Sequence, residues 1–203
     1  GGEYALICRG EDTTTDGTAT ASGVLAVTDS SYLVQDPFYS LDDSDINRQT
    51  SKHFQMVWGP EDNQTVDEEF VAGNLTNMER IWDTCIDDLG FAEPVTEIGG
   101  SGDGKQYKTN IYVTETGLSA HESHVDGWAL AGEKDGYMHI VLNPDAMRVD
   151  PPSWTTAHEF GHVVTGHQGG GWLNNKYIRG WTESAAEWFS EQFLTSDNYA
   201  HGG

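Results

Sequence analysis

Basic residues are scarce in this chain. Its 203 residues include 10 Lys and Arg against 33 Asp and Glu, which gives a formal net charge of −23. Such a surface repels the phosphates of nucleic acids and the anionic lipids of a membrane, so neither is expected as a partner. No apolar stretch approaches the length of a membrane span. Strong acidity favours solubility and fits an extracellular setting, so we expect a secreted protein.

Cysteine is scarce too, since the chain has only Cys8 and Cys85. Either the two form one disulfide between the N-terminal segment and a later helix, or both are unpaired thiols, and the sequence leaves both alternatives open. Neither cysteine has the spacing of a metal ligand. Two glycosylation sequons, at Asn63 and Asn74, are compatible with secretion.

The length of the chain predicts one domain. A lead-in rich in Thr, Ser, Asp and Gly spans residues 1–50, and a compact domain is expected over 51–203. Alternating and turn-bounded runs predict short strands in the lead-in at 4–8, 24–28 and 32–34.

The pattern after residue 50 predicts an α+β fold with a mixed sheet. We expect a core strand at 53–58, a long packing helix at 66–89, a strand at 107–114, and a hairpin formed by 126–131 and 137–142. Thr65 and Glu68 have the spacing of a capping box at the start of the long helix, and Gly90 fits its end.

The most informative motif is His158-Glu159-Phe160-Gly161-His162. On a helix His158 and His162 lie one turn apart on the same face, so both imidazoles can bind one metal ion. Glu159 lies beside them and can accept a proton from water at that ion. This His-Glu-x-x-His pattern is the signature of a zinc-hydrolase helix, which needs a third protein ligand and an open fourth position.

Glu183 is the candidate for the third ligand. A helix is expected around it, with Thr182 as the N-cap, and Glu183 and Glu187 share one face of that helix. A linker that is Gly-rich at 169–171 would let this helix fold back on the motif helix. Glu187 would then accept a hydrogen bond from the free ring nitrogen of a ligand histidine. An alternative in which Glu187 replaces Glu183 as the ligand stays open.

Other histidine patterns are less informative. A metzincin site needs a Gly three residues after His162 and a His three residues further, where this chain has Thr165 and Gln168. His121 and His124 are three residues apart, but we prefer the interpretation of a solvated loop.

The motif helix and the Glu183 segment together resemble the gluzincin clan of zinc peptidases, whose third ligand is a Glu on a second helix. Trp181 and Glu183-Ser184-Ala185-Ala186-Glu187-Trp188 are similar to the Trp…Glu-Gly-Phe-Ala-Glu-Trp stretch of the thermolysin-like and aminopeptidase groups. Ser184 stands where those groups have Gly, and the spacing from the Trp to the first Glu is one residue shorter. More loosely, 51–195 is similar to a poorly characterised family of secreted fungal and bacterial proteins with a gluzincin-like core.

The resemblance implies a zincin-like fold and a zinc metallopeptidase. In it His158, His162 and Glu183 would hold Zn²⁺, Glu159 would be the general base, and peptides or proteins would be the substrates. By the same resemblance, an extended peptide could pair with the strand at 128–131 or with 137–140. The sequence assigns no residue to the oxyanion and no oligomeric state.

Two alternatives to a complete enzyme follow from the same residues. The protein could be a secreted non-catalytic module on a zincin scaffold, which binds zinc or carbohydrate in the manner of an adhesin. Because little chain follows the second helix, the chain could also be the catalytic half of a longer protein.

Overall fold

The computed structural model describes residues 32–61, 65–98, 104–121, 129–147, 153–168 and 179–193. The elements follow in the order β1 (Asn47–Thr50), β2 (Phe54–Trp58), α1 (Glu68–Trp82), the π-helix η1 (Asp83–Asp88), β3 (Thr109–Val113), β4 (Ala129–Lys134), β5 (Tyr137–Leu142), α2 (Pro144–Met147), α3 (Trp154–Gln168) and α4 (Arg179–Glu191). This combination of one sheet and several helices confirms the predicted α+β class. The strands expected at 4–8 and 24–28 lie outside the described residues.

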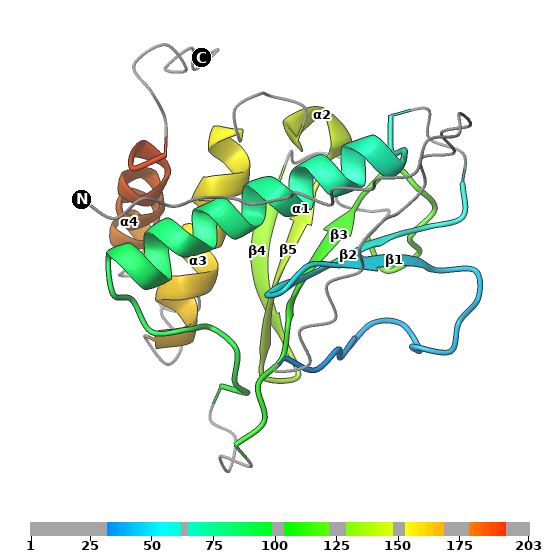
Figure 1. Cartoon of the computed structure of the whole chain (residues 1–203), viewed down its shortest axis with the longest axis horizontal. Helices are drawn as coiled ribbons and strands as arrows, with labels where there is room; N and C mark the ends of the chain where they lie inside the picture. Colours follow the sequence, from blue (N-terminus) through cyan, green and yellow to red (C-terminus); the bar gives the residue numbers. More distant parts are fainter. Residues whose placement is uncertain are drawn as a thin grey trace, which may run out of the picture.

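Five strands form one mixed sheet in the order β1-β2-β3-β5-β4 (Figure 1). β2, β3 and β5 are parallel to one another, whereas β1 and β4 run antiparallel to their neighbours at the two ends. Because β5 is an inner strand between β3 and β4, the expectation that 137–140 could receive a substrate peptide is wrong. β4 is the last strand in this order.

Two pairings of the lead-in change the expectations for residues 1–50. β1 pairs with β2, so residues 47–50 belong to the same sheet as the elements that follow the expected boundary at residue 50. The strand expected at 32–34 is reduced to a single bridge between Leu33 and Tyr107.

The predicted hairpin is present as β4 and β5. Asp135 and Gly136 connect the strands, and both have positive φ, at 53° and 86°. Two consecutive positive φ values are typical of a type I′ turn, which Asp-Gly favours because glycine adopts them without strain. The turn fixes the register, in which Ala131 lies opposite Ile140.

α1 begins two residues later than a Thr65 cap would require. Its N-cap is Asp67, whose carboxylate accepts a hydrogen bond from the N–H of Phe70 at 2.8 Å. The predicted capping box of Thr65 and Glu68 is therefore wrong, since Asp67 satisfies the free N–H group instead. The helix continues into η1 and ends before Gly90, which has φ of 75°, as expected for a helix stop.

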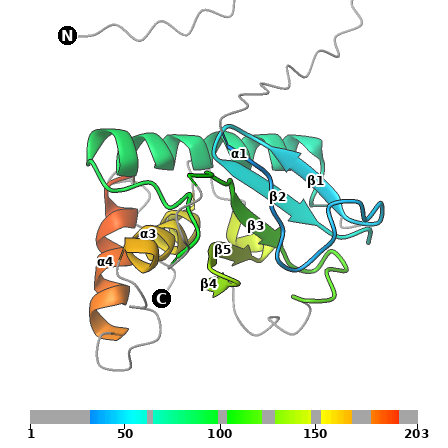
Figure 2. The same cartoon turned by 90° about the horizontal axis from the view of Figure 1, so that it is seen from below.

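The core between the helices and the sheet anchors the motif helix. α1 runs across one face of the sheet, and α3 packs on the same side against β4 and β5 (Figure 2). Phe160, in the middle of the His-Glu-x-x-His motif, is fully buried, with its ring centroid 5.4 Å from that of Phe54 and 6.0 Å from that of Trp82. Burial of a side chain of this size contributes roughly 1.5–3 kcal/mol. The apolar residue of the motif therefore holds the helix that carries its histidines.

The second face of the sheet carries a cluster of aromatic and histidine side chains. The ring of His121 lies 4.5 Å from that of Tyr112 and 4.6 Å from that of Phe38, and His121 is only 2 % exposed. The prediction of a solvated loop is therefore wrong for His121, because apolar burial on this face was not visible in the local sequence. His124 lies outside the described residues.

Cys85 and Asn74, the acceptor residue of a glycosylation sequon, are both buried. Cys85 is a free thiol with no exposed surface, so the disulfide alternative is not the one this structure has, and Cys8 lies outside the described residues. Asn74 is 7 % exposed and donates to the carbonyl of Phe70 within α1. Its sequon is therefore inaccessible in the folded chain, and Asn63 lies outside the described residues.

α4 packs against the side of α3 that faces away from the sheet (Figure 2). It begins at Arg179, so Thr182 lies inside the helix and the prediction of an N-cap there is wrong. The Gly-rich linker at 169–171 lies outside the described residues.

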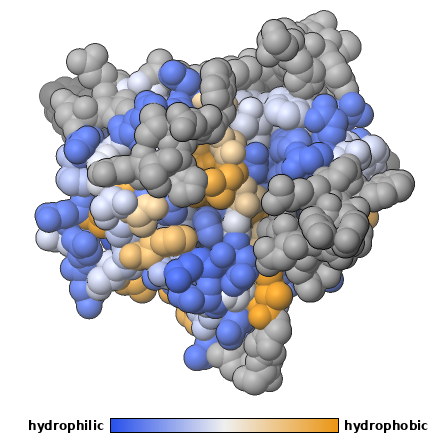
Figure 3. All heavy atoms as spheres, turned by 180° about the vertical axis from the view of Figure 1, so that it is seen from behind, coloured by the Kyte–Doolittle hydropathy of each residue, from blue (hydrophilic) through white to orange (hydrophobic). Residues whose placement is uncertain are grey.

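Apolar side chains at the surface are scattered. On the face in Figure 3 they form small patches between hydrophilic residues. The large hydrophobic residues that are exposed in the described part are Leu33, Val34, Leu41, Leu89 and Trp188. Within that part, no helix has the length and apolar character needed to cross a membrane.

Candidate metal centre

The motif helix is present as predicted. Ser153 precedes α3, and its hydroxyl accepts a hydrogen bond from the N–H of Thr156 at 3.0 Å. That contact satisfies one free N–H group of the first turn and fixes where the helix begins. His158 and His162 follow on one face of α3, and they are 7 % and 6 % exposed.

Glu183 meets the two histidines, as the sequence predicts for the third ligand. Its Oε2 lies 3.2 Å from Nε2 of His158 and 3.4 Å from Nε2 of His162. The two Nε2 atoms lie 3.1 Å apart. Among the described residues, these three form the one group of His, Cys, Asp or Glu side chains able to hold a metal ion, with ligand atoms all within 4.8 Å of one another.

The spacing of these atoms fits a tetrahedral metal ion. Zinc binds His nitrogen and carboxylate oxygen at about 2.0–2.2 Å, so two ligand atoms at tetrahedral angles lie about 3.3–3.5 Å apart. Hydrogen bonding alone does not account for the trio. A ring nitrogen that donates has one hydrogen, so three mutual contacts among His158, His162 and Glu183 cannot all be hydrogen bonds.

The environment of His162 favours the form that binds a metal. Burial lowers the pKa of His162 and the neighbouring His158 acts in the same direction, whereas Glu183 opposes them. The net direction is downward, toward the neutral imidazole. A neutral imidazole is what metal coordination requires.

Glu187 lies one turn after Glu183, on the other side of the His158 ring. Its Oε2 is 3.6 Å from Nδ1 of His158, while Glu183 approaches Nε2 of the same ring. Glu187 is thus placed beside the nitrogen that does not point at the other ligand atoms, where a carboxylate can orient a ligand histidine. The distance of 3.6 Å is too long for a hydrogen bond, so the predicted hydrogen bond to this nitrogen is not formed in this structure. The arrangement favours Glu183 over Glu187 as the candidate ligand.

Glu159 lies next to His158 and is buried, with 7 % exposure. Burial raises the pKa of its carboxyl to about 7, repulsion from Glu183 adds to the rise, and a backbone hydrogen bond from Ala131 of β4 opposes it. Its carboxylate therefore lies between the metal-ligand candidates and the last strand of the sheet. A cation between the three ligand atoms would counteract the rise.

Trp154 is a neighbour of the centre that the sequence analysis did not single out. It lies one turn before His158 on α3, and the centroids of the two rings are 4.5 Å apart. An aromatic residue four positions before the first histidine of the motif is the signal that could have identified it.

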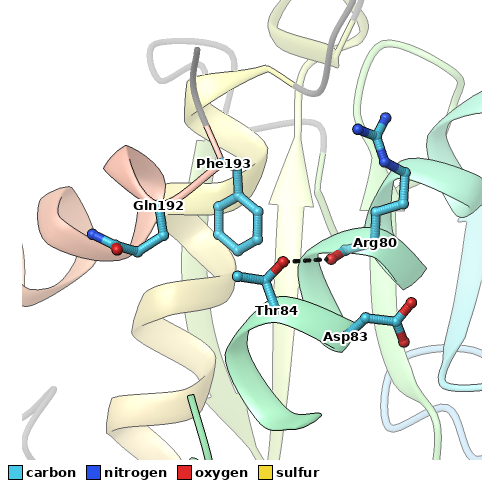
Figure 4. A pocket seen from close by; sticks show the side chains of 5 residues that line it. All are labelled: Arg80, Asp83, Thr84, Gln192 and Phe193. Carbon is cyan, nitrogen blue, oxygen red and sulfur yellow. Dashed lines mark hydrogen bonds between the residues drawn. The ribbon is translucent and has the colours of Figure 1, made fainter. Parts of the chain in front are cut away.

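A separate groove lies away from these residues. It has a volume of about 340 Å³ and is lined by Arg80, Asp83, Thr84, Gln192 and Phe193. Figure 4 shows the ring of Phe193 beside Thr84, between the end of α1 and the chain that follows α4. None of its lining residues belongs to the histidine and glutamate cluster, so we place the candidate chemistry at the cluster, where donor atoms converge.

The comparisons with known proteins leave the activity open. No curated protein and no solved structure matches the chain. One family model matches residues 28–201, which is most of the chain. The chain therefore belongs to DUF6055, a family of unknown function.

Proposed function

We propose that this protein is a zinc-dependent hydrolase that cleaves peptide bonds. The observation that carries the proposal is the convergence of Nε2 of His158, Nε2 of His162 and Oε2 of Glu183 at 3.1–3.4 Å from one another. Two imidazoles and one carboxylate form the ligand set of several catalytic zinc sites, in which a fourth position is left for water or substrate. The same donors also suit other divalent transition metals, so metal content has to be measured.

Glu159 supports catalysis over simple metal binding. Zinc held by the three residues would supply a Lewis acid that makes bound water a stronger acid near neutral pH. Glu159 would accept a proton from that water during attack on a carbonyl and pass it to the leaving amine. A protein that only stores or binds the metal has no need for a buried carboxylate at this position.

The sheet supports a peptide as the substrate. β4 (Ala129–Lys134) is the last strand in the sheet order and pairs with β5 on one side. The backbone of Ala131 lowers the pKa of Glu159, which supports a position for the proposed general base beside this strand. An extended peptide that adds to β4 would therefore lie beside Glu159. We include a zincin-like fold in the proposal, because the sheet, motif helix and ligand helix follow in the order that the resemblance implies.

The setting we propose is extracellular. The net charge of −23 is its main support, since it favours solubility and disfavours binding to nucleic acid. Fractionation of the source cells and their medium tests this, and recovery of the protein solely inside the cells would contradict it.

Metal analysis of the purified chain tests the proposed site. We expect about one zinc per wild-type chain. The Glu183→Ala variant should lose it, and Glu191→Ala, a change of an exposed carboxylate on the same helix, should retain it. Absence of zinc from the wild type after reconstitution would overturn the proposal.

The Glu159→Gln variant separates the peptidase from the alternative of a non-catalytic binding module. The variant should keep its zinc and lose hydrolysis of a mixed fluorogenic peptide library. A wild-type chain that holds zinc, cleaves no peptide and keeps its biological activity in the Glu159→Gln form would favour the binding module instead.

A further inference from the structure

α3 and α4 come close together at Gly161. A methyl group on Gly161 would lie 3.0 Å from Cα of Ala186 and 3.0 Å from Cβ of Phe189, with Cδ2 of the same ring at 3.2 Å. Contacts this short force the neighbouring atoms to move by a few tenths of an ångström. Ala186 and Phe189 are fully buried or nearly so, at 0 % and 1 % exposure, and two of these contacts involve the backbone or Cβ of α4. The movement would therefore displace the helix itself.

The same contact lies next to the metal-ligand candidates. Gly161 immediately precedes His162, and Ala186 follows Glu183 by nearly one helical turn, which places Ala186 and Glu183 on one side of α4. The side chain of Glu183 is 64 % exposed. Packing around that side chain therefore does little to fix it, and its position depends on where α4 places its backbone.

We propose that Gly161 is a positioning residue that sets the distance between Glu183 and the two histidines. This inference rests on the proposed zinc site. A metal site tolerates deviations of about 0.2 Å in its ligand distances, and the shift that a methyl group requires at Gly161 is of the same size or larger. The absence of a side chain at Gly161 thus lets α4 come close enough for Oε2 of Glu183 to act as the third metal ligand beside the two histidines.

An effect of Gly161 on fold stability alone can be separated from an effect on the position of Glu183. Glycine weakens a helix interior relative to alanine, so the Gly161→Ala variant gains helix propensity and should stay folded. Gly73 in α1 is the matched control, because a methyl group there would meet nothing within 4 Å. Gly73→Ala has the same propensity gain without the contact.

Competition titrations of the metal-free chain with a chromophoric zinc chelator test the proposal. Gly161→Ala should bind zinc about 10–100-fold more weakly than the wild type, in the range seen when support for a ligand is removed. Gly73→Ala should bind as the wild type does. Ala186→Ser, which adds one atom to the same contact from α4, should weaken binding in the same direction and serves if Gly161→Ala does not fold. Zinc affinity within twofold of wild type in a folded Gly161→Ala chain would overturn the inference.

A double-mutant cycle identifies the route of the effect. If Gly161 acts through Glu183, Gly161→Ala should cause no further loss of the weak zinc affinity that His158 and His162 alone give to a Glu183→Ala chain, titrated at high zinc concentration. An equal loss in both backgrounds would overturn the inference, because the residue would then act on the histidines or on the fold at large. A wild type that binds no zinc overturns this inference together with the proposed function. Zinc binding that needs Glu183 but is indifferent to Gly161 overturns this inference alone.

Discussion

The indole ring of Trp154 packs against the imidazole of His158, with ring centroids 4.5 Å apart and planes inclined by 42°. The two residues are one helical turn apart on α3, so the contact is built into the helix that carries the motif. Trp154 is partly exposed, whereas His158 is buried. A fluorescent side chain therefore touches one of the three candidate metal ligands.

Trp154 should report metal binding directly. Co²⁺ or Cu²⁺ bound at His158 is expected to quench the fluorescence of Trp154 more than that of Trp58, which lies on β2. Trp154→Phe should keep the metal and lose most of the quenching, and Trp58→Phe should keep both. Equal quenching in Trp154→Phe and the wild type would place the metal away from His158.

Removal of Glu187 should weaken the site without abolishing it. Its Oε2 lies 3.6 Å from Nδ1 of His158, where a carboxylate can orient the ring. We expect Glu187→Ala to lower zinc affinity about 10–100-fold while one zinc per chain still binds at saturation. Isothermal titration of metal-free variants measures both quantities. Complete loss of zinc binding in Glu187→Ala, with zinc binding retained in Glu183→Ala, would mean that Glu187, one turn later, is the third ligand.

Local sequence was sufficient for the part of the centre that lies on one helix. His158 and His162 are one helical turn apart, so their common face followed from their spacing, and Glu159 is adjacent to His158 in the sequence. The position of Glu183 depends on how α4 packs against α3. The sequence identified Glu183 as the partner but not that Gly161 meets Ala186 and Phe189, because that contact joins residues from two helices.

Capping and burial were predicted less well. Asp67 and Thr65 are both good N-cap residues, and the choice between them depends on where packing places the first turn of α1. η1 has the local pattern of an ordinary helix, so its wider hydrogen bonding was not visible in the sequence. His121 reads as polar, and its burial arises from contacts with Phe38 and Tyr112 in other parts of the chain.

Cys85 should be unreactive in the folded protein. It has no exposed surface, and burial raises the pKa of its thiol to about 12. The thiolate is the reactive form, so at pH 8 an aromatic disulfide reagent should modify Cys85 only when the chain unfolds. The measurement is best made on a Cys8→Ser chain, in which Cys85 is the one remaining thiol. Rapid modification without denaturant would contradict the burial.

The pair of Glu79 and His53 should make stability depend on pH. Oε2 of Glu79 lies 2.6 Å from Nδ1 of His53, and the N–H of His53 donates to Oε1 at 2.8 Å. Burial alone would raise the pKa of Glu79. The hydrogen bonds from the ring and the backbone N–H of His53 outweigh burial, so the pKa lies below its usual value of 4.5.

The sign of the effect follows from that lowered pKa. A carboxyl whose pKa is lower in the folded than in the unfolded chain stabilises the fold above the unfolded pKa, and the contribution is lost as pH falls through the folded pKa. Glu79→Gln should therefore reduce the free energy of unfolding by about 1–3 kcal/mol at pH 7, as expected for hydrogen bonds to a charged group. The difference from wild type should shrink below the unfolded pKa, near pH 4.5.

Urea denaturation at pH 7, 5 and 3.5 measures this difference, with Glu69→Gln, an exposed residue of α1, as the control. Asp83 acts in the opposite direction, because burial, then repulsion from Asp87 and Glu79, raises its pKa. Glu79→Gln would remove part of that repulsion. The loss in the free energy of unfolding at pH 7 therefore equals the contribution of the hydrogen bonds minus the stabilisation gained at Asp83. A difference that stays constant from pH 7 to 3.5 would mean that the charge of Glu79 contributes nothing, and that its contacts with His53 stabilise the fold through shape alone.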